Sequence, residues 1–199
     1  MNNKILILFS HPAIQKSRVN KGLIESVKNL DGITFHDLYE KYPDFLINVT
    51  VEQNLLKEHD IIVFHHPFYW YGCPAILKEW MDLVLEYGFA YGPEGNKLEG
   101  KKIISVITTG GSKDAYKPDG HNKYTIRQFL LPFEQTASLC RMQYLPPLVI
   151  HDSISMNLNM QLHQYAELYK NILIMLRDDK INYTKALEFE YINDYYKNI

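Results

Sequence analysis

The fold of this chain is indicated first by residues 61–75, which read Ile61-Ile62-Val63-Phe64-His65-His66-Pro67-Phe68-Tyr69-Trp70-Tyr71-Gly72-Cys73-Pro74-Ala75. An apolar run leads into a loop with four bulky aromatic side chains, and an amphipathic stretch follows. A strand, a loop and a helix in this order are typical of an open α/β sheet, in which ligands bind at the carboxyl edge of the strands. Aromatic side chains at that edge suit a flat, polarisable ring. The alternative is a loop whose aromatic side chains only pack on the core.

Composition limits the class of protein. A chain of 199 residues with 46% hydrophobic content can bury one core, so we expect one domain over residues 1–199, with a C-terminal helix and tail from about 154. The net charge of -2 offers no field that attracts nucleic acid or an anionic membrane. Cys73 and Cys140 are too few for a disulfide framework and lack metal-type spacing, so we expect no metal and a reducing, cytoplasmic location.

Apolar runs alternate with helical patterns along the chain. Strands are expected at Lys4–Phe9, Ile33–Leu38, Ile61–His65, Ile103–Thr108 and Leu148–His151. Helices are expected at Val19–Leu30, Val51–Glu58, Ala75 to about Tyr87, Tyr124 to about Cys140, and Met156–Arg177. This rhythm predicts right-handed crossovers and a mostly parallel sheet. An aromatic, charged tail over Tyr183–Ile199 follows.

The loop after the first strand, residues 10–20, separates two doubly wound folds. It contains no glycine, so the GxGxxG fingerprint of the six-stranded dinucleotide fold and the Walker loop are both absent. We therefore expect a flavodoxin-like three-layer fold, with a five-stranded parallel sheet of order 2-1-3-4-5 and helices on both faces. Ser17, Arg18 and Asn20 of this phosphate loop could hold a phosphate monoester at a helix N-terminus. Alternatively, Ser17 is only the N-cap of the next helix.

A third loop strengthens the ligand interpretation. Thr108-Thr109-Gly110-Gly111-Ser112 follows the fourth strand, and its two glycines let backbone amides approach a ring edge. In the order 2-1-3-4-5, this glycine loop, the phosphate loop and the aromatic loop of residues 67–74 converge on one crevice at the topological switch point. A phosphate at one end of the crevice and a flat ring at the other describe FMN.

Further motifs carry a family resemblance. They are Phe9-Ser10-His11-Pro12, His66-Pro67-Phe68-Tyr69-Trp70-Tyr71, Gly88-Phe89-Ala90-Tyr91-Gly92, Thr108-Thr109-Gly110-Gly111 and Tyr144-Leu145-Pro146-Pro147. With these motifs in this order, the chain resembles the NAD(P)H:quinone oxidoreductase family of flavodoxin-like flavoproteins. It is most similar to the short bacterial branch, the ancillary oxidoreductases of glutathione-gated potassium-efflux systems. The matching motifs lie within residues 4–152.

The resemblance implies a set of cofactor-binding residues. The phosphate of FMN would be held by His11, Ser17, Arg18, Val19 and Asn20. The ring would be lined by Pro67, Phe68, Tyr69, Trp70 and Tyr71. Its pyrimidine edge would meet Thr108, Thr109, Gly110 and Gly111. Relatives that bind FAD share these loops, so FAD stays open as the cofactor.

The resemblance also implies three further site residues. In the family, a tyrosine and a histidine after the glycine loop stabilise the reduced ring. Tyr116 keeps the family's spacing, and His121 lies one residue closer than its counterpart. A phenol backed by an imidazole can offset negative charge at the pyrimidine edge; the alternative for His121 is a solvated loop histidine. Tyr91 matches an aromatic residue that covers the substrate pocket from the partner subunit.

The expected function is an FMN-dependent NAD(P)H dehydrogenase that passes two electrons to a quinone or similar acceptor by a ping-pong mechanism. The resemblance implies a homodimer with active sites at the interface, with NAD(P)H as co-substrate and no nucleic acid partner. A second hypothesis is a flavin-bearing regulatory subunit that docks on a potassium-efflux membrane protein, peripheral to the inner face of the membrane. A one-electron flavodoxin carrier is less favoured, because such carriers are strongly acidic and this chain is nearly neutral.

Overall fold

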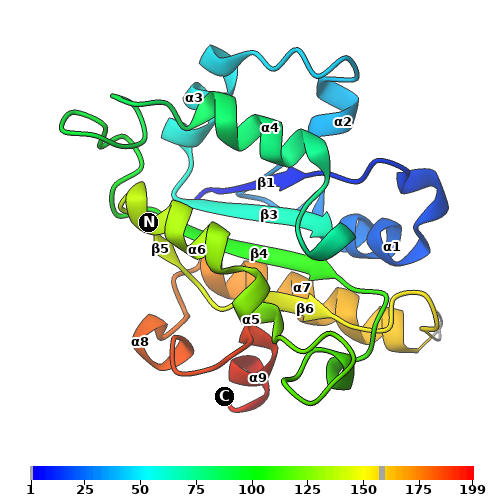
Figure 1. Cartoon of the computed structure of the whole chain (residues 1–199). Helices are drawn as coiled ribbons and strands as arrows, with labels where there is room; N and C mark the ends of the chain where they lie inside the picture. The colour runs from blue at the N-terminus through cyan, green and yellow to red at the C-terminus, as the bar shows by residue number, and fades with distance from the viewer. Residues whose placement is uncertain (1, 157–159) are drawn as a thin grey trace.

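The computed structural model of the chain describes residues 2–156 and 160–199 and has a parallel sheet at its centre (Figure 1). The strands are β1 (Ile5–Phe9), β2 (Ile33–Asp37), β3 (Ile61–Pro67), β4 (Lys102–Thr108), β5 (Gln143–Tyr144) and β6 (Leu148–Ile150). Their order is β2-β1-β3-β4-β5, and β6 also pairs with β4. The flavodoxin-like fold class and the strand order expected from the sequence are therefore confirmed.

The fifth position of the sheet holds the strand expected at Leu148–His151, observed as β6, and also the short strand β5, which was not expected. Strand β5 pairs with the start of β4 at Lys102, and β6 pairs with its end at Thr108. Pro146 and Pro147 lie between the two segments, and proline has no N–H to donate to a strand ladder. The ladder is therefore interrupted for three residues and then resumes.

Helices cover both faces of the sheet (Figure 1). They are α1 (Arg18–Val27), α2 (Leu38–Lys41), α3 (Val49–Glu58), α4 (Ala75–Val84), α5 (Ile126–Phe129), α6 (Leu131–Leu139), α7 (Gln161–Arg177), α8 (Tyr183–Ala186) and α9 (Ile192–Lys197). Helices α1 and α7 pack on one face around Phe9, and α3, α4 and α6 pack on the other around Leu8. In the part of the chain that is described, no helix combines the length and apolarity needed to cross a bilayer.

Two expected helices differ from the structure by a break or by more than three residues at one end. The helix expected from Tyr124 to Cys140 is split into α5 and α6 at Leu130, because Pro132 in the first turn of α6 cannot donate the hydrogen bond that would continue α5. The expected helix start at Met156 is followed by residues outside the described range, and α7 begins at Gln161.

The C-terminal tail is packed against the sheet. The amide side chain of Asn193 in α9 accepts from the Val149 N–H at 3.0 Å and donates to the Val149 carbonyl at 2.9 Å. These two hydrogen bonds pair the backbone N–H and carbonyl of Val149 at the edge of the sheet, as a further strand would. The tail therefore supports the sheet edge next to the glycine loop.

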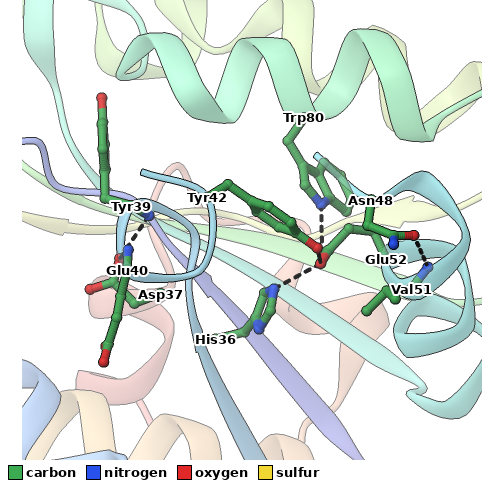
Figure 2. A network of polar contacts seen from close by, with 9 residues as sticks. All are labelled: His36, Asp37, Tyr39, Glu40, Tyr42, Asn48, Val51, Glu52 and Trp80. Atoms are coloured by element: carbon green, nitrogen blue, oxygen red, sulfur yellow. Dashed lines mark hydrogen bonds and ion pairs between the residues drawn. The ribbon is translucent and has the colours of Figure 1, made fainter. Parts of the chain in front are cut away.

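A buried carboxylate joins β2 to the helices on one face of the sheet (Figure 2). Glu52 of α3 is fully buried and accepts hydrogen bonds from Tyr42 Oη at 2.6 Å and Trp80 Nε1 at 2.8 Å, with His36 Nε2 at 2.9 Å. Burial by itself raises the pKa of Glu52, but the three hydrogen bonds outweigh burial and hold the pKa below its usual value of 4.5. The carboxylate is therefore ionised and anchors the segment after α2 to α4.

We expect Glu52→Gln to lower the free energy of unfolding by roughly 2 kcal/mol at pH 7, because the amide nitrogen cannot accept the bonds that the carboxylate accepts. The folded pKa is depressed, so this contribution is present above about pH 4.5 and declines as the pH falls through the folded pKa. Urea unfolding of both proteins from pH 7 to pH 4 measures the difference. Glu58→Gln, at an exposed position of the same helix, is the control. An equal loss in both variants would contradict the anchoring role.

Candidate functional site

The three loops of interest meet at the carboxyl edge of the sheet. Strands β3 and β4 end in register, with Pro67 opposite Thr108, and the Phe68 N–H donates to the Thr108 carbonyl at 2.8 Å. On the other side of β3, the Ser10 N–H donates to the His65 carbonyl at 3.0 Å. The phosphate loop, aromatic loop and glycine loop therefore start from one line across the sheet.

A cavity of about 380 Å³ opens at the phosphate loop, and we call it the polar cavity because this loop contributes basic, hydroxyl and amide side chains to its lining. Its lining includes all five residues expected at the phosphate: His11, Ser17, Arg18, Val19 and Asn20. The N-terminus of α1 opens into this cavity, and the exposed Lys16 adds a second cationic side chain beside Arg18. Unpaired amides and positive charge at a helix N-terminus suit an anion. Ser17 is the N-cap of α1 as well, since it accepts from the Asn20 N–H at 3.3 Å.

His11 contributes a neutral donor to the polar cavity. Its Nδ1 accepts from the Ala13 N–H at 3.1 Å, which leaves the proton on Nε2. Burial lowers the pKa of His11, so the ring is uncharged near neutral pH. The cavity lining also includes Pro67, Phe68, Tyr69, Thr108 and Gly110, so Thr108, expected at the pyrimidine edge of the ring, lies beside the phosphate-loop residues.

A second, aromatic cavity of about 380 Å³ adjoins the first. The two cavities share Phe68 and Gly110, and the aromatic cavity also includes Trp70, Tyr71, Gly111, Tyr116 and His121. Phe68, Trp70 and Tyr71 therefore lie together with the expected catalytic pair, whereas the other two expected ring residues, Pro67 and Tyr69, line only the polar cavity. Thr109 is the one glycine-loop residue expected at the ring edge that lines neither cavity; its buried hydroxyl instead donates to the Gly111 carbonyl at 2.8 Å.

The aromatic loop has an unusual backbone. Trp70 (φ 49°, ψ 43°) and Tyr71 (φ 63°) are left-handed, a conformation that bulky L residues rarely adopt. Tyr71 is held by stacking on Phe129, with ring centroids 5.1 Å apart, and by a hydrogen bond to Asn122 at 3.3 Å. Trp70 is 95% exposed. Strain of this kind is typical of ligand sites, and here it presents two rings at the mouth of the aromatic cavity.

The glycine loop is closely packed. A Cβ on Gly110 would lie 2.9 Å from Ile154 Cδ1, and one on Gly111 would lie 3.3 Å from Tyr116 Cε2. Tyr116 is buried and packs edge to face on Phe68, and burial raises the pKa of its phenol. Gly111 therefore allows Tyr116 to approach the loop, and Gly110 allows Ile154 to do so.

The histidine that contacts this cluster is His151, which the sequence analysis did not identify. Its ring lies 5.9 Å from that of Tyr116, and its Nδ1 lies 3.2 Å from the Thr109 hydroxyl. Burial is the main cause that lowers the pKa of His151 to about 4, so the ring is neutral. His121, in contrast, is exposed at the aromatic cavity. The position of His151 directly after an apolar strand at the ligand edge was the available sequence signal.

Tyr91 lies apart from both cavities within one chain. It packs edge to face on Tyr87, with centroids 5.7 Å apart, and lines a separate groove with Met81 and Leu139. Two of these neighbours, Tyr87 and Leu139, are exposed. Tyr91 could therefore reach an aromatic cavity only in another subunit.

Comparison with known proteins places the chain in a wider group. A family model described as the flavodoxin-like fold matches residues 3–173. The glutathione-regulated potassium-efflux system ancillary protein KefG of Pectobacterium carotovorum is 53% identical over 148 residues, which are 74% of this chain and 81% of the relative.

Two solved structures are similar over most of the chain. General stress protein 14 from Treponema denticola, in complex with FMN, is 38% identical, with a TM-score of 0.83 over 87% of this chain and 99% of that one. An NADPH-quinone reductase from P. pentosaceus is 32% identical, with a TM-score of 0.78 over 85% of this chain and 96% of that one.

We expect Trp70→Gly to be more stable than Trp70→Ala by roughly 1 kcal/mol, because glycine adopts the left-handed backbone of position 70 without a steric penalty. Both variants lose the same exposed indole, so their difference isolates the backbone term. Urea unfolding of the two variants measures it. If alanine were tolerated as well as glycine, the aromatic loop would not be strained.

Proposed function

This chain belongs to the flavodoxin-like fold family, and we propose that it is an FMN-dependent NAD(P)H dehydrogenase that reduces a quinone or a similar acceptor. The observation that carries this proposal is the pair of adjoining cavities, one polar and cationic and the other aromatic, with Phe68 and Gly110 common to both. A flavin nucleotide has the same division into a phosphate and a flat ring. The FMN complex of general stress protein 14 and the NADPH-quinone reductase support the proposal.

The residues present fit FMN. Ser17, Arg18 and the amides at the start of α1 would hold the phosphate, and Tyr69, Trp70 and Tyr71 would line the ring. When bound, FMN supplies two-electron hydride chemistry between NAD(P)H and the acceptor. We propose FMN rather than FAD because FMN is the ligand named for the 38% identical structure.

Tyr116 is proposed as the residue that stabilises negative charge at the pyrimidine edge of the ring. Its hydroxyl is a neutral donor, since burial raises the pKa of the phenol. A fixed donor in a partly buried site stabilises charge more than water does. His121, at the exposed side of the same cavity, is proposed to contact the substrate and assist Tyr116. One aromatic cavity would receive the nicotinamide and the acceptor in turn, which corresponds to a ping-pong mechanism.

We further propose a homodimer in which Tyr91 closes the aromatic cavity of the partner. Exposed Tyr87 and Leu139 beside Tyr91 supply apolar surface for such a contact. A second candidate function, favoured by the 53% identity to the potassium-efflux ancillary protein, is that of a cytoplasmic flavin-bearing subunit that docks on a membrane transporter. The two functions are compatible in one protein.

The absorption spectrum of the purified protein tests the proposed function. We expect flavin bands near-stoichiometric with protein, bleaching on anaerobic addition of NADPH or NADH, and recovery of the bands on addition of a quinone. Protein that neither carries nor takes up flavin would contradict the proposal. Flavin that is not reduced by either nucleotide would contradict the dehydrogenase assignment alone.

We expect Tyr116→Phe to slow the reduction of bound FMN by NAD(P)H at least about tenfold, because it removes a donor at the edge where charge develops. Affinity for oxidised FMN should hardly change. Stopped-flow absorbance measures the reductive half-reaction, with Tyr124→Phe, which also packs on Phe129, as the control. His121→Gln should have a milder effect. Unchanged rates in both site variants would remove the catalytic assignments.

A further inference from the structure

A buried network of hydrogen bonds runs from α7 along one face of the sheet to the polar cavity. Tyr169 Oη lies 3.3 Å from His65 Nδ1, and His65 Nε2 lies 3.1 Å from Asn20 Oδ1. The Asn20 Nδ2 then donates to Ser17 Oγ at 3.0 Å and to Thr108 Oγ1 at 3.1 Å. Tyr169 and His65 are fully buried and Asn20 is 2% exposed, so water does not replace these bonds. The three residues at the end of this hydrogen-bond network, Asn20, Ser17 and Thr108, line the polar cavity.

The number of donors and acceptors decides which atom donates in each hydrogen bond of this network. If Tyr169 donates to Nδ1, then His65 donates from Nε2 to the Asn20 oxygen, and both amide protons of Asn20 reach hydroxyl oxygens. In the reverse arrangement, the Tyr169 O–H and one amide proton of Asn20 would lose the partners that these bonds give them. A buried donor without a partner costs about 1–3 kcal/mol, so the first arrangement is favoured.

His65 is suited to this role because it stays neutral. Burial lowers its pKa to about 3, and the neighbouring rings of His66 and His11 act in the same direction. The other groups in contact with it are the uncharged Tyr169 and the ring of Phe9, 5.1 Å away. A neutral imidazole has one donor and one acceptor, which matches one donor from Tyr169 and one acceptor on Asn20.

The orientation of Asn20 decides what the cavity offers to a ligand. Ser17 Oγ accepts from both the N–H and the side-chain Nδ2 of Asn20, and Thr108 Oγ1 accepts from Nδ2. Each hydroxyl therefore keeps its own proton free to donate into the cavity. If the amide were reversed, its oxygen would accept these two protons and the cavity would lose both donors.

We propose that His65 is a positioning residue that holds the Asn20 amide in the orientation in which Ser17 and Thr108 donate to a phosphate monoester. This inference rests on the proposed flavin nucleotide site and adds a residue that does not itself line the cavity. Hydrogen bonds from hydroxyls to a phosphate dianion are charge-assisted, so their loss affects phosphate-bearing ligands selectively.

The test compares FMN with riboflavin, which has the same ring and no phosphate, in fluorescence titrations of flavin-free full-length protein. We expect His65→Leu to weaken FMN binding by roughly tenfold or more and to change riboflavin affinity less than about threefold. His65→Gln should restore FMN affinity, because its amide can accept from Tyr169 and donate to Asn20. His59→Gln, another buried histidine with two hydrogen bonds, is the control for a general loss of stability.

If the His65→Leu variant does not fold, two further measurements test the proposal. Tyr169→Phe leaves the imidazole in place but removes the bond that selects its tautomer, so we expect a loss of FMN affinity with riboflavin affinity kept. Nitrogen-15 NMR of the wild-type imidazoles should show His65 protonated at Nε2 only. Protonation at Nδ1, or an equal loss of FMN and riboflavin affinity in folded variants, would overturn the proposal. If the wild-type protein bound neither FMN nor riboflavin, both the proposed function and this inference would be contradicted.

Discussion

The parallel pairing of β1, β3 and β4 is the constraint on which the rest of this structure depends. Parallel strands end at a common edge, and the register sets Phe9 opposite His65 and Pro67 opposite Thr108. Because β2 lies on the far side of β1, the crossovers diverge between β1 and β3 and leave a crevice there. The three loops that follow these strands line this crevice, so residues almost 100 positions apart in the chain form one site.

The loops that line the crevice are contacted by two elements outside it, α7 at the phosphate loop and the C-terminal tail at the glycine loop. The phosphate loop is held by the buried bonds that begin at Tyr169 of α7. Lys113, the residue after the glycine loop, contacts the tail: it pairs with Asp194 at 3.2 Å and lies over the ring of Tyr191. The loops themselves are short and partly strained, so this support gives them a defined shape without a ligand.

Local patterns in the sequence predicted β1 to β4, β6 and the convergence of the three loops, because parallel order and strand ends follow from periodicity and crossover rules. The short strand β5 was not predicted, because its two residues are too few to show a periodicity and Pro146 and Pro147 separate it from β6. The sequence places His65 and His151 at the ends of strands, but it does not show what either side chain contacts. Their partners, Asn20 and Thr109, are 45 and 42 residues away and become apparent only after folding.

A crystal structure of the protein grown with FMN tests the central claim most directly, namely that the two adjoining cavities receive one flavin nucleotide. The account predicts the phosphate in the polar cavity, within hydrogen-bond distance of the Ser17 and Thr108 hydroxyls, and the ring between Tyr71 and Gly110. A phosphate directed out of the polar cavity, or a ring bound away from the aromatic loop, would contradict it.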